Sequence, residues 1–257
     1  METSTDRILT THVGSLPRPP DLFELLTDED QGRLADPAAL EARVAAAVND
    51  IVARQVDTGI DIVSDGEMGK IAYTFYVKHR LSGIQDGQPP GASVPEDVVN
   101  LDMQEHPDFA EQARKARAGW ALQYGRPWVV GPLSYENRAP MDRDIAHLNA
   151  AVGAAKPKEA FMNAASPGVL SKFVPNDYYK DENSYIAAMA DAMKTEYEAI
   201  HDAGFLLQID CPDLGSARHN QYQKLSDDEF LKIAERNAEA VNSATANIPP
   251  DRMRLHI

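Results

Sequence analysis

Apolar residues recur at three- and four-residue spacing in three stretches of the chain, and this spacing predicts helices with one buried face. Asp36 and Pro37 suit the N-cap and first turn of the first helix, and Ser226 to Glu229 form a capping box that opens the third. The second helix is capped by Asp181 or Ser184. The buried faces consist of Leu40, Val44, Val48, Ile51 and Val52; Ile186, Met189, Met193, Tyr197 and Ile200; and Phe230, Ile233, Ala234 and Val241.

Two segments share one pattern, in which a helix ends at a glycine, a short apolar run follows, and a carboxylate closes the run. The first passes from Gly59 to Asp65, and the second from Gly204 to Asp210. Such glycines are typical of helix C-caps, and the apolar runs are typical of buried parallel strands. Ligands bind at the carboxyl end of parallel strands, so both aspartates are candidate site residues.

Three further strands are predicted at residues 8–15, 160–168 and 253–257, and a hairpin arm or edge strand at 128–135, where Pro132 excludes a central position. Glycines and prolines mark residues 79–157 as an insertion, with a polar helix from Phe109 to Tyr124. The alternation of strands and helices indicates an α/β fold with a parallel sheet. No glycine-rich nucleotide motif follows the first strand, so we favour a barrel and treat 1–257 as one domain.

Composition and charge exclude several classes of partner and location. The net charge of −15 over 257 residues argues against nucleic acid or an anionic membrane surface as a partner. A single cysteine, Cys211, excludes an internal disulfide and fits a reducing compartment. No apolar run suits a signal peptide or a membrane span, so we expect a cytoplasmic globular protein. The sequence does not indicate an oligomeric state.

Polar and small residues stand at the predicted strand ends, where a barrel gathers them at one rim. Inward carboxylates there suit an ammonium group, a metal or acid–base chemistry, whereas each alone is equally explained as a cap or a loop ligand. His12 is more typical of a packed strand histidine than of a ligand, and Cys211 of a core residue. The loop with Arg218, His219 and Tyr222 is placed to reach a ligand. The strand-end residues are Gly14, Ser15, Asp65, Glu67, Ser166, Asp210, Asp213 and His256.

Four motifs, in the same order and at suitable distances, resemble the C-terminal catalytic domain of the cobalamin-independent methionine synthase family and its short stand-alone relatives. They are Thr10 to Arg18, Ser64 to Glu67, Leu207 to Asp210, and Arg254 to His256. The resemblance covers essentially the whole chain. It implies a (β/α)8 TIM-barrel fold, of which this chain holds the first five strands, and a zinc-dependent transfer of a methyl group from 5-methyltetrahydrofolate (polyglutamate) to the thiol of homocysteine, giving methionine.

The resemblance also implies roles for individual residues. Val13, Gly14 and Ser15 would line the amino-acid thiol site, Glu67 and Asp210 would bind its ammonium group, and His256 would be the first zinc ligand. The remaining zinc ligands and the family's catalytic histidine would lie beyond Ile257. We therefore interpret the chain as C-terminally incomplete and expect it to be inactive alone, since catalytic zinc takes three protein ligands; a split enzyme completed by a second chain is the alternative.

One departure concerns the methyl donor. Family members carry a tryptophan against the pterin after the third strand, whereas Val169 to Phe173 follow Gly168 here. Phe173 is the candidate replacement. Two alternatives therefore stay open: zinc-dependent alkyl transfer with another donor or another thiol, such as coenzyme M, and a non-catalytic fragment that binds an amino acid or a partner chain.

Overall fold

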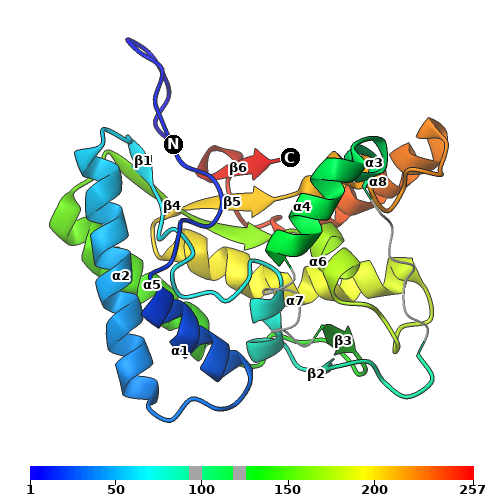
Figure 1. Ribbon diagram of the computed structural model, residues 1–257. Coiled ribbons are helices and arrows are strands. Elements are labelled where there is room, and N and C mark those ends of the chain that lie inside the picture. The colour runs from blue at the N-terminus through cyan, green and yellow to red at the C-terminus, as the bar shows by residue number, and fades with distance from the viewer. Residues whose placement is uncertain (93–99, 118–125) are drawn as a thin grey trace.

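The computed structural model describes residues 1–92, 100–117 and 126–257, and it is an α/β structure built on a parallel sheet (Figure 1). The sheet has the order β1-β4-β5-β6, with all neighbours parallel. Thr11 forms a single parallel bridge to Ile62 at the β1 edge. Five chain segments therefore lie side by side as part of a TIM barrel, which confirms the predicted fold class. The strands are β1 (Ile62–Val63), β4 (Glu159–Ala165), β5 (Leu206–Asp210) and β6 (Met253–His256).

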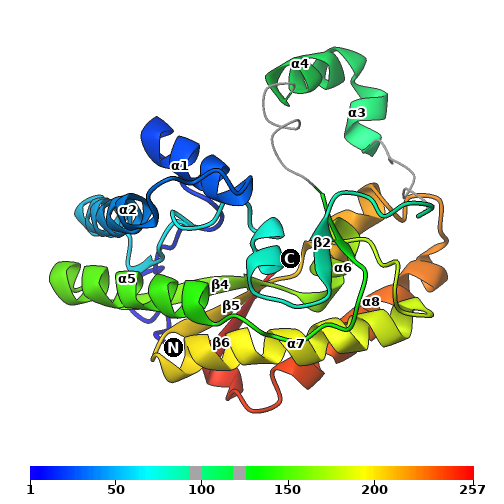
Figure 2. The same ribbon diagram turned by 90° about the horizontal axis from the view of Figure 1, so that it is seen from below.

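The long helices lie together on one side of the sheet, where α2 packs on α5 and α7 packs on α8 (Figure 2). Asp36 accepts hydrogen bonds from the amides of the first turn of α2, Asp181 caps α7, and the capping box at Ser226 opens α8. Gly59 and Gly204 end α2 and α7 with positive φ, as predicted. The helices are α1 (Pro20–Asp30), α2 (Pro37–Asp57), α5 (Ala139–Ala155), α7 (Glu182–Asp202) and α8 (Asp227–Ala244).

A short antiparallel pair, β2 (Ile84–Asp86) and β3 (Pro127–Val129), lies beside the sheet (Figure 2). Two further helices are α3 (Leu101–Glu105), which is hydrogen-bonded to Gln223 through Gln104, and α4 (Pro107–Arg117). The hairpin arm predicted at residues 128–135 is confirmed, but it is shorter and ends before Pro132. The polar helix predicted from Phe109 to Tyr124 is confirmed as far as Arg117, and its remainder lies outside the described residues.

Two strand predictions are corrected. Residues 8–15 form a single bridge rather than a strand, because they meet the sheet only through Thr10 and Thr11 and the rest of the segment stays largely exposed. The strand predicted for 160–168 ends at Ala165, and Ser166 caps the helix α6 (Pro167–Phe173). Proline at the first helical position and an N-capping serine give the same local sequence as a turn, which explains the error.

A buried ionic cluster joins the 3-10 helix Phe75–His79 and the residue that follows it to α5 and α7. The Arg80 guanidinium donates to Glu196 at 3.0 Å and to Asp144 at 2.5 Å, and it lies 4.4 Å from the centre of the Tyr76 ring. Tyr76 and Tyr135 each donate a hydroxyl hydrogen bond to Glu196. The cluster holds the segment after β1 against the helical layer.

Candidate functional site

The register of the sheet brings the predicted strand-end residues together. Asp210 pairs with His256 on one side and with Ala165 on the other. Two residues earlier in each strand, Asn163 of β4 is paired with Gln208 of β5. Because side chains two residues apart share a face of a strand, Asn163, Gln208 and Asp210 face the same space.

Glu67 reaches this space from the loop after β1. Its backbone has φ of 57°, a left-handed conformation that a residue with a side chain rarely adopts. The Asp65 carboxylate accepts the Glu67 N–H at 2.9 Å, and the Arg18 guanidinium donates to the Glu67 carbonyl at 2.8 Å. Strained backbone of this kind persists where surrounding contacts enforce it. Asp65, predicted as a site residue, therefore supports the Glu67 backbone and is itself buried, which raises the pKa of its carboxyl.

A continuous hydrogen-bonded chain connects the N-terminal segment with β6. Ser15 donates to one oxygen of Glu67, and the Asn163 amide donates to the other at 2.9 Å. The same Asn163 nitrogen donates to Asp210 at 2.8 Å. Asp210 also accepts from Gln208 at 2.8 Å and from His256 Nδ1 at 3.0 Å. Two carboxylates that are 3% and 5% exposed, Glu67 and Asp210, thus meet around one amide nitrogen.

The predicted residues Val13 and Gly14 come just before Ser15 in the sequence, and neither takes part in the hydrogen bonds described above. Gly14 has φ of 87°, so the turn before Ser15 needs a glycine. Leu16, which follows Ser15, donates its N–H to the Gly66 carbonyl at 3.0 Å, and this hydrogen bond ties the N-terminal segment to the Glu67 loop. Val13 is 36% exposed. The structure therefore unites Ser15, Glu67, Asp210 and His256, whereas Val13 and Gly14 are linked to them through the backbone that precedes Ser15.

Three partly buried aromatic rings gather at the end of α6. Phe173, at the end of α6, meets the rings of Tyr73 and Phe75 edge-on, with centroids 5.8 and 6.4 Å apart. Burial raises the pKa of Tyr73 to about 12, and the charges of Asp210, Glu67 and Asp213 add to this effect.

His256, the predicted zinc ligand, lies beside Asp210. His256 donates from Nδ1 to Asp210, an arrangement that many metal-binding histidines have, with Nε2 left to bind the metal. Among residues 1–92, 100–117 and 126–257, however, no group of three or more His, Cys, Asp or Glu side chains is placed to hold a metal ion. The described residues therefore supply one suitable imidazole but do not form a zinc site by themselves.

Other predicted candidates have structural roles. Ser166 donates to Asp213 at 2.7 Å, and Asn237 of α8 donates to the other oxygen of Asp213 at 2.9 Å. Cys211 is fully buried, and burial raises the pKa of its thiol to about 12, as fits a core cysteine. His12 bonds the Gly14 carbonyl, and Arg218 pairs with Asp227.

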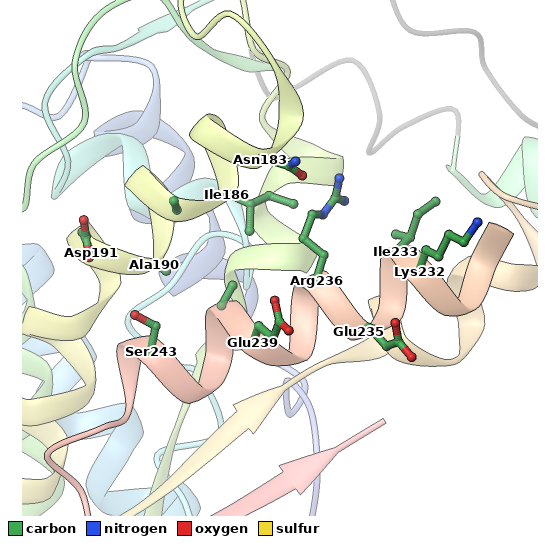
Figure 3. Close-up of a pocket in the computed structure, with 12 residues that line it drawn as sticks. Asn183, Ile186, Ala190, Asp191, Lys232, Ile233, Glu235, Arg236, Glu239 and Ser243 are labelled. Carbon is green, nitrogen blue, oxygen red and sulfur yellow. The ribbon is translucent and has the colours of Figure 1, made fainter. Parts of the chain in front are cut away.

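A groove of about 670 Å³ runs between α7 and α8, away from the strand ends (Figure 3). Alanine and isoleucine side chains form part of its lining, and Asp191, Lys232, Glu235, Arg236 and Glu239 also line it. None of the strand-end residues takes part. The groove therefore belongs to the outer helical layer and not to the candidate site.

Sequence reasoning missed Asn163 and Gln208. An amide side chain inside an apolar strand gives no motif, and its partners lie 96 and 47 residues away for Asn163. The one available signal was a buried polar residue in a strand predicted to be apolar, since such a residue needs a partner.

Comparisons with known proteins find sequence similarity to methionine synthases. The chain is 24% identical over 213 residues to the methionine synthase of Sulfolobus acidocaldarius, covering 82% of this chain and 53% of that protein. It is 22% identical over 204 residues to the methionine synthase of Sulfurisphaera tokodaii, covering 79% and 51%. The chain thus spans about half the length of the curated relatives it matches. No family model matches the sequence.

Solved structures show the same fold. A B12-independent methionine synthase from a Shewanella species, in complex with selenomethionine, superposes with a TM-score of 0.64 at 18% identity, over 96% of this chain and 60% of that one. A putative B12-independent methionine synthase from Listeria monocytogenes gives 0.63 at 19% identity, over 98% and 66%. No helix in the described part of the chain has the length and apolar character needed to cross a membrane. In sequence the chain is thus similar to curated methionine synthases, and in fold it is similar to B12-independent methionine synthases.

Proposed function

We propose that the chain binds homocysteine and takes part in the methylation of its sulfur, which yields methionine. The observation that carries the proposal is the carboxylate pair of Glu67 and Asp210, joined by Asn163 at the carboxyl ends of the parallel strands. Two buried carboxylates at one point favour a ligand with a positive charge and several N–H donors. The ammonium group of an amino acid has both.

The comparison with the Shewanella enzyme supports an amino-acid ligand, because that structure holds selenomethionine. In this chain the segment at Ser15 and Leu16 lies against the Glu67 loop, because Ser15 donates to the Glu67 carboxylate and Leu16 donates to the Gly66 carbonyl. We assign the ammonium group to Glu67 and Asp210, and the rest of the amino acid to the side of Val13, Gly14 and Ser15.

For the methyl donor we propose 5-methyltetrahydrofolate, as a polyglutamate. The support is the cluster of Tyr73, Phe75 and Phe173, whose rings pack edge-on and are each only partly buried, so that aromatic surface is left for a flat ring system. In the reaction the thiolate sulfur forms a bond to the methyl carbon, the carbon–nitrogen bond of the donor breaks, and the donor nitrogen keeps the electron pair and takes up a proton.

We propose His256 as a zinc ligand, because its hydrogen bond to Asp210 through Nδ1 leaves Nε2 to bind a metal ion. Because the described residues do not complete a zinc site, we derive no step through the metal. The other ligands would have to come from outside the described residues, and we expect the 257-residue chain alone to be inactive. We propose that the protein acts in the cytoplasm, and the support is its single cysteine, which fits a reducing compartment.

The proposal is tested by calorimetric titration of the protein with L-homocysteine, beside Asp210→Asn. Removing one of two buried charges that face the ammonium group should weaken binding by roughly 2–5 kcal/mol. Unchanged affinity in the folded variant would remove Asp210 from the site. Titration with 2-mercaptoethanesulfonate, a thiol with an anionic head, tests the alternative acceptor: tight binding of this thiol in place of homocysteine would show that the scaffold serves another substrate.

A further inference from the structure

Asn163 is fixed at both its backbone and its side chain. It lies in β4, opposite Gln208 of β5, and is 5% exposed. The buried Lys70 ammonium donates to its backbone carbonyl at 3.0 Å. Lys70 in turn lies 4.8 Å from the centre of the Tyr76 ring, in the buried cluster around Arg80. The amide group of Asn163 is thus presented from a rigid part of the molecule.

The two hydrogens of this amide are divided between the two carboxylates. Nδ2 is 2.9 Å from a Glu67 oxygen and 2.8 Å from an Asp210 oxygen. These two oxygens therefore lie on either side of one nitrogen and cannot be farther apart than the sum of the two distances, 5.7 Å. A ligand ammonium that bridges two carboxylates needs the same span, because its N–H···O distances are alike, at about 2.7–2.9 Å.

We propose that Asn163 is a positioning residue, which holds Glu67 and Asp210 at the span of a single nitrogen and thereby makes the site selective for a primary ammonium group. This inference rests on the proposed function, since it concerns how the same pair recognises its ligand. Asn163 acts through the carboxylates and does not itself provide an acceptor for the ammonium group.

The physical reason is that two like charges in a buried site repel each other and would turn apart without a donor between them. Each carboxylate oxygen has two lone pairs, and the Asn163 amide uses one lone pair on each of two oxygens. The remaining lone pairs accept N–H groups from a ligand that enters at the strand ends. A ligand without an amino group gains nothing from this arrangement.

A purely structural role for Asn163, as a tie between strands, makes a different prediction. Loss of such a tie would lower stability and weaken all ligands alike. Loss of a positioning residue should weaken ligands with an ammonium group far more than ligands without one. The ratio of two affinities separates these roles, whereas either affinity alone does not.

The experiment uses L-homocysteine and 4-mercaptobutanoate, which has the same thiol, chain and carboxylate but no amino group. Both are titrated by calorimetry into the wild-type protein, Asn163→Leu and the control Asn237→Leu. Asn237 is also a buried asparagine that donates to a buried carboxylate, Asp213, at 2.9 Å, but it lies outside the carboxylate pair. We expect Asn163→Leu to reduce the preference for homocysteine by about tenfold or more, and Asn237→Leu to leave it unchanged.

A preference for homocysteine that survives in folded Asn163→Leu would overturn this inference and leave the proposed function intact. A wild-type protein that does not bind homocysteine would overturn the proposed function, and one that binds both thiols equally would overturn the assignment of the ammonium group to the carboxylate pair and this inference with it. If Asn163→Leu does not fold, Asn163→Ser replaces it: its single hydroxyl hydrogen serves one carboxylate at a time, so the bridge is lost while the site stays polar. The same loss of preference is expected, and an unchanged preference would again contradict the role.

Discussion

Replacement of Arg80 by methionine should destabilise the protein strongly, because Arg80 is the counter-ion of two buried carboxylates. Arg80 is 3% exposed, and its partners Glu196 and Asp144 are 0% and 10% exposed as side chains. Methionine fills much of the volume but removes the cation that both acids contact. The cation–aromatic contact with Tyr76 is also lost.

The size of the effect follows from the burial of the partners. Removal of one member of a buried ion pair costs about 3–5 kcal/mol, since the remaining charge stays in a poorly solvated site. For a chain of this length each kcal/mol lowers the melting temperature by about 2–4 °C, so we expect a decrease of about 10 °C. Arg143, which is 48% exposed and pairs with Glu29 and Glu41, gives the matched control. Arg143→Met should cost no more than about 1 kcal/mol.

The pH dependence gives an independent check. Burial alone would raise the pKa of the Glu196 carboxyl, but the charges of Arg80 and Lys70 and the tyrosine hydrogen bonds hold this pKa below its usual value. In the wild type this acid therefore adds stability above its unfolded pKa of about 4.3, and the contribution is lost as the pH falls through the folded pKa. Without Arg80 the folded pKa should lie above the unfolded one, so the destabilisation is greatest at neutral pH and shrinks toward about pH 4.

The assay is urea denaturation followed by circular dichroism at pH 7 and near pH 4.5. Adding Glu196→Gln to Arg80→Met should recover part of the lost stability at pH 7, because one buried charge is then removed. A loss below about 1 kcal/mol for Arg80→Met, or an equal loss at both pH values, would refute the reasoning.

Three further predictions concern single side chains. Gly168→Ala should lower the free energy of unfolding by about 1–3 kcal/mol, because the added Cβ would lie 2.1 Å from Asp213 Oδ2. Gly153→Ala in α5 meets nothing within 4 Å and should raise the free energy of unfolding by about 0.5–1 kcal/mol. Chemical denaturation of both variants measures these changes. Asp65→Asn keeps the acceptor for the Glu67 N–H and removes a buried charge, so it should melt at or above the wild-type temperature, while Asp65→Ala should lose about 1–3 kcal/mol. Cys211, whose pKa burial raises to about 12, should resist a thiol reagent at pH 8 until the protein unfolds, and rapid labelling of the native protein would contradict its placement.

Local chemistry explains which parts of the fold were predictable. The cap at Asp36, the capping box at Ser226 and the glycines at 59 and 204 act within four residues of themselves, and all were predicted and confirmed. Ser166 to Gly168 was misassigned because helix starts and turns use the same residues. The first strand was overestimated because strand formation depends on a neighbour, which the sequence does not display.

The sequence predicted those site residues that stand at the end of an apolar run. Glu67, Asp210 and His256 follow apolar runs and so were found, and the structure joins them in one hydrogen-bonded chain. Asn163 and Arg80 depend on partners that are distant along the chain, 116 residues for Arg80 and Glu196. No periodicity or local motif carries that information.

The most direct test of the central claim is a crystal structure of the protein with L-homocysteine. The account predicts the ligand nitrogen within about 2.7–3.2 Å of oxygens from both Glu67 and Asp210, with the Asn163 amide still between the two carboxylates. A homocysteine bound elsewhere, or one whose nitrogen contacts neither carboxylate, would contradict it.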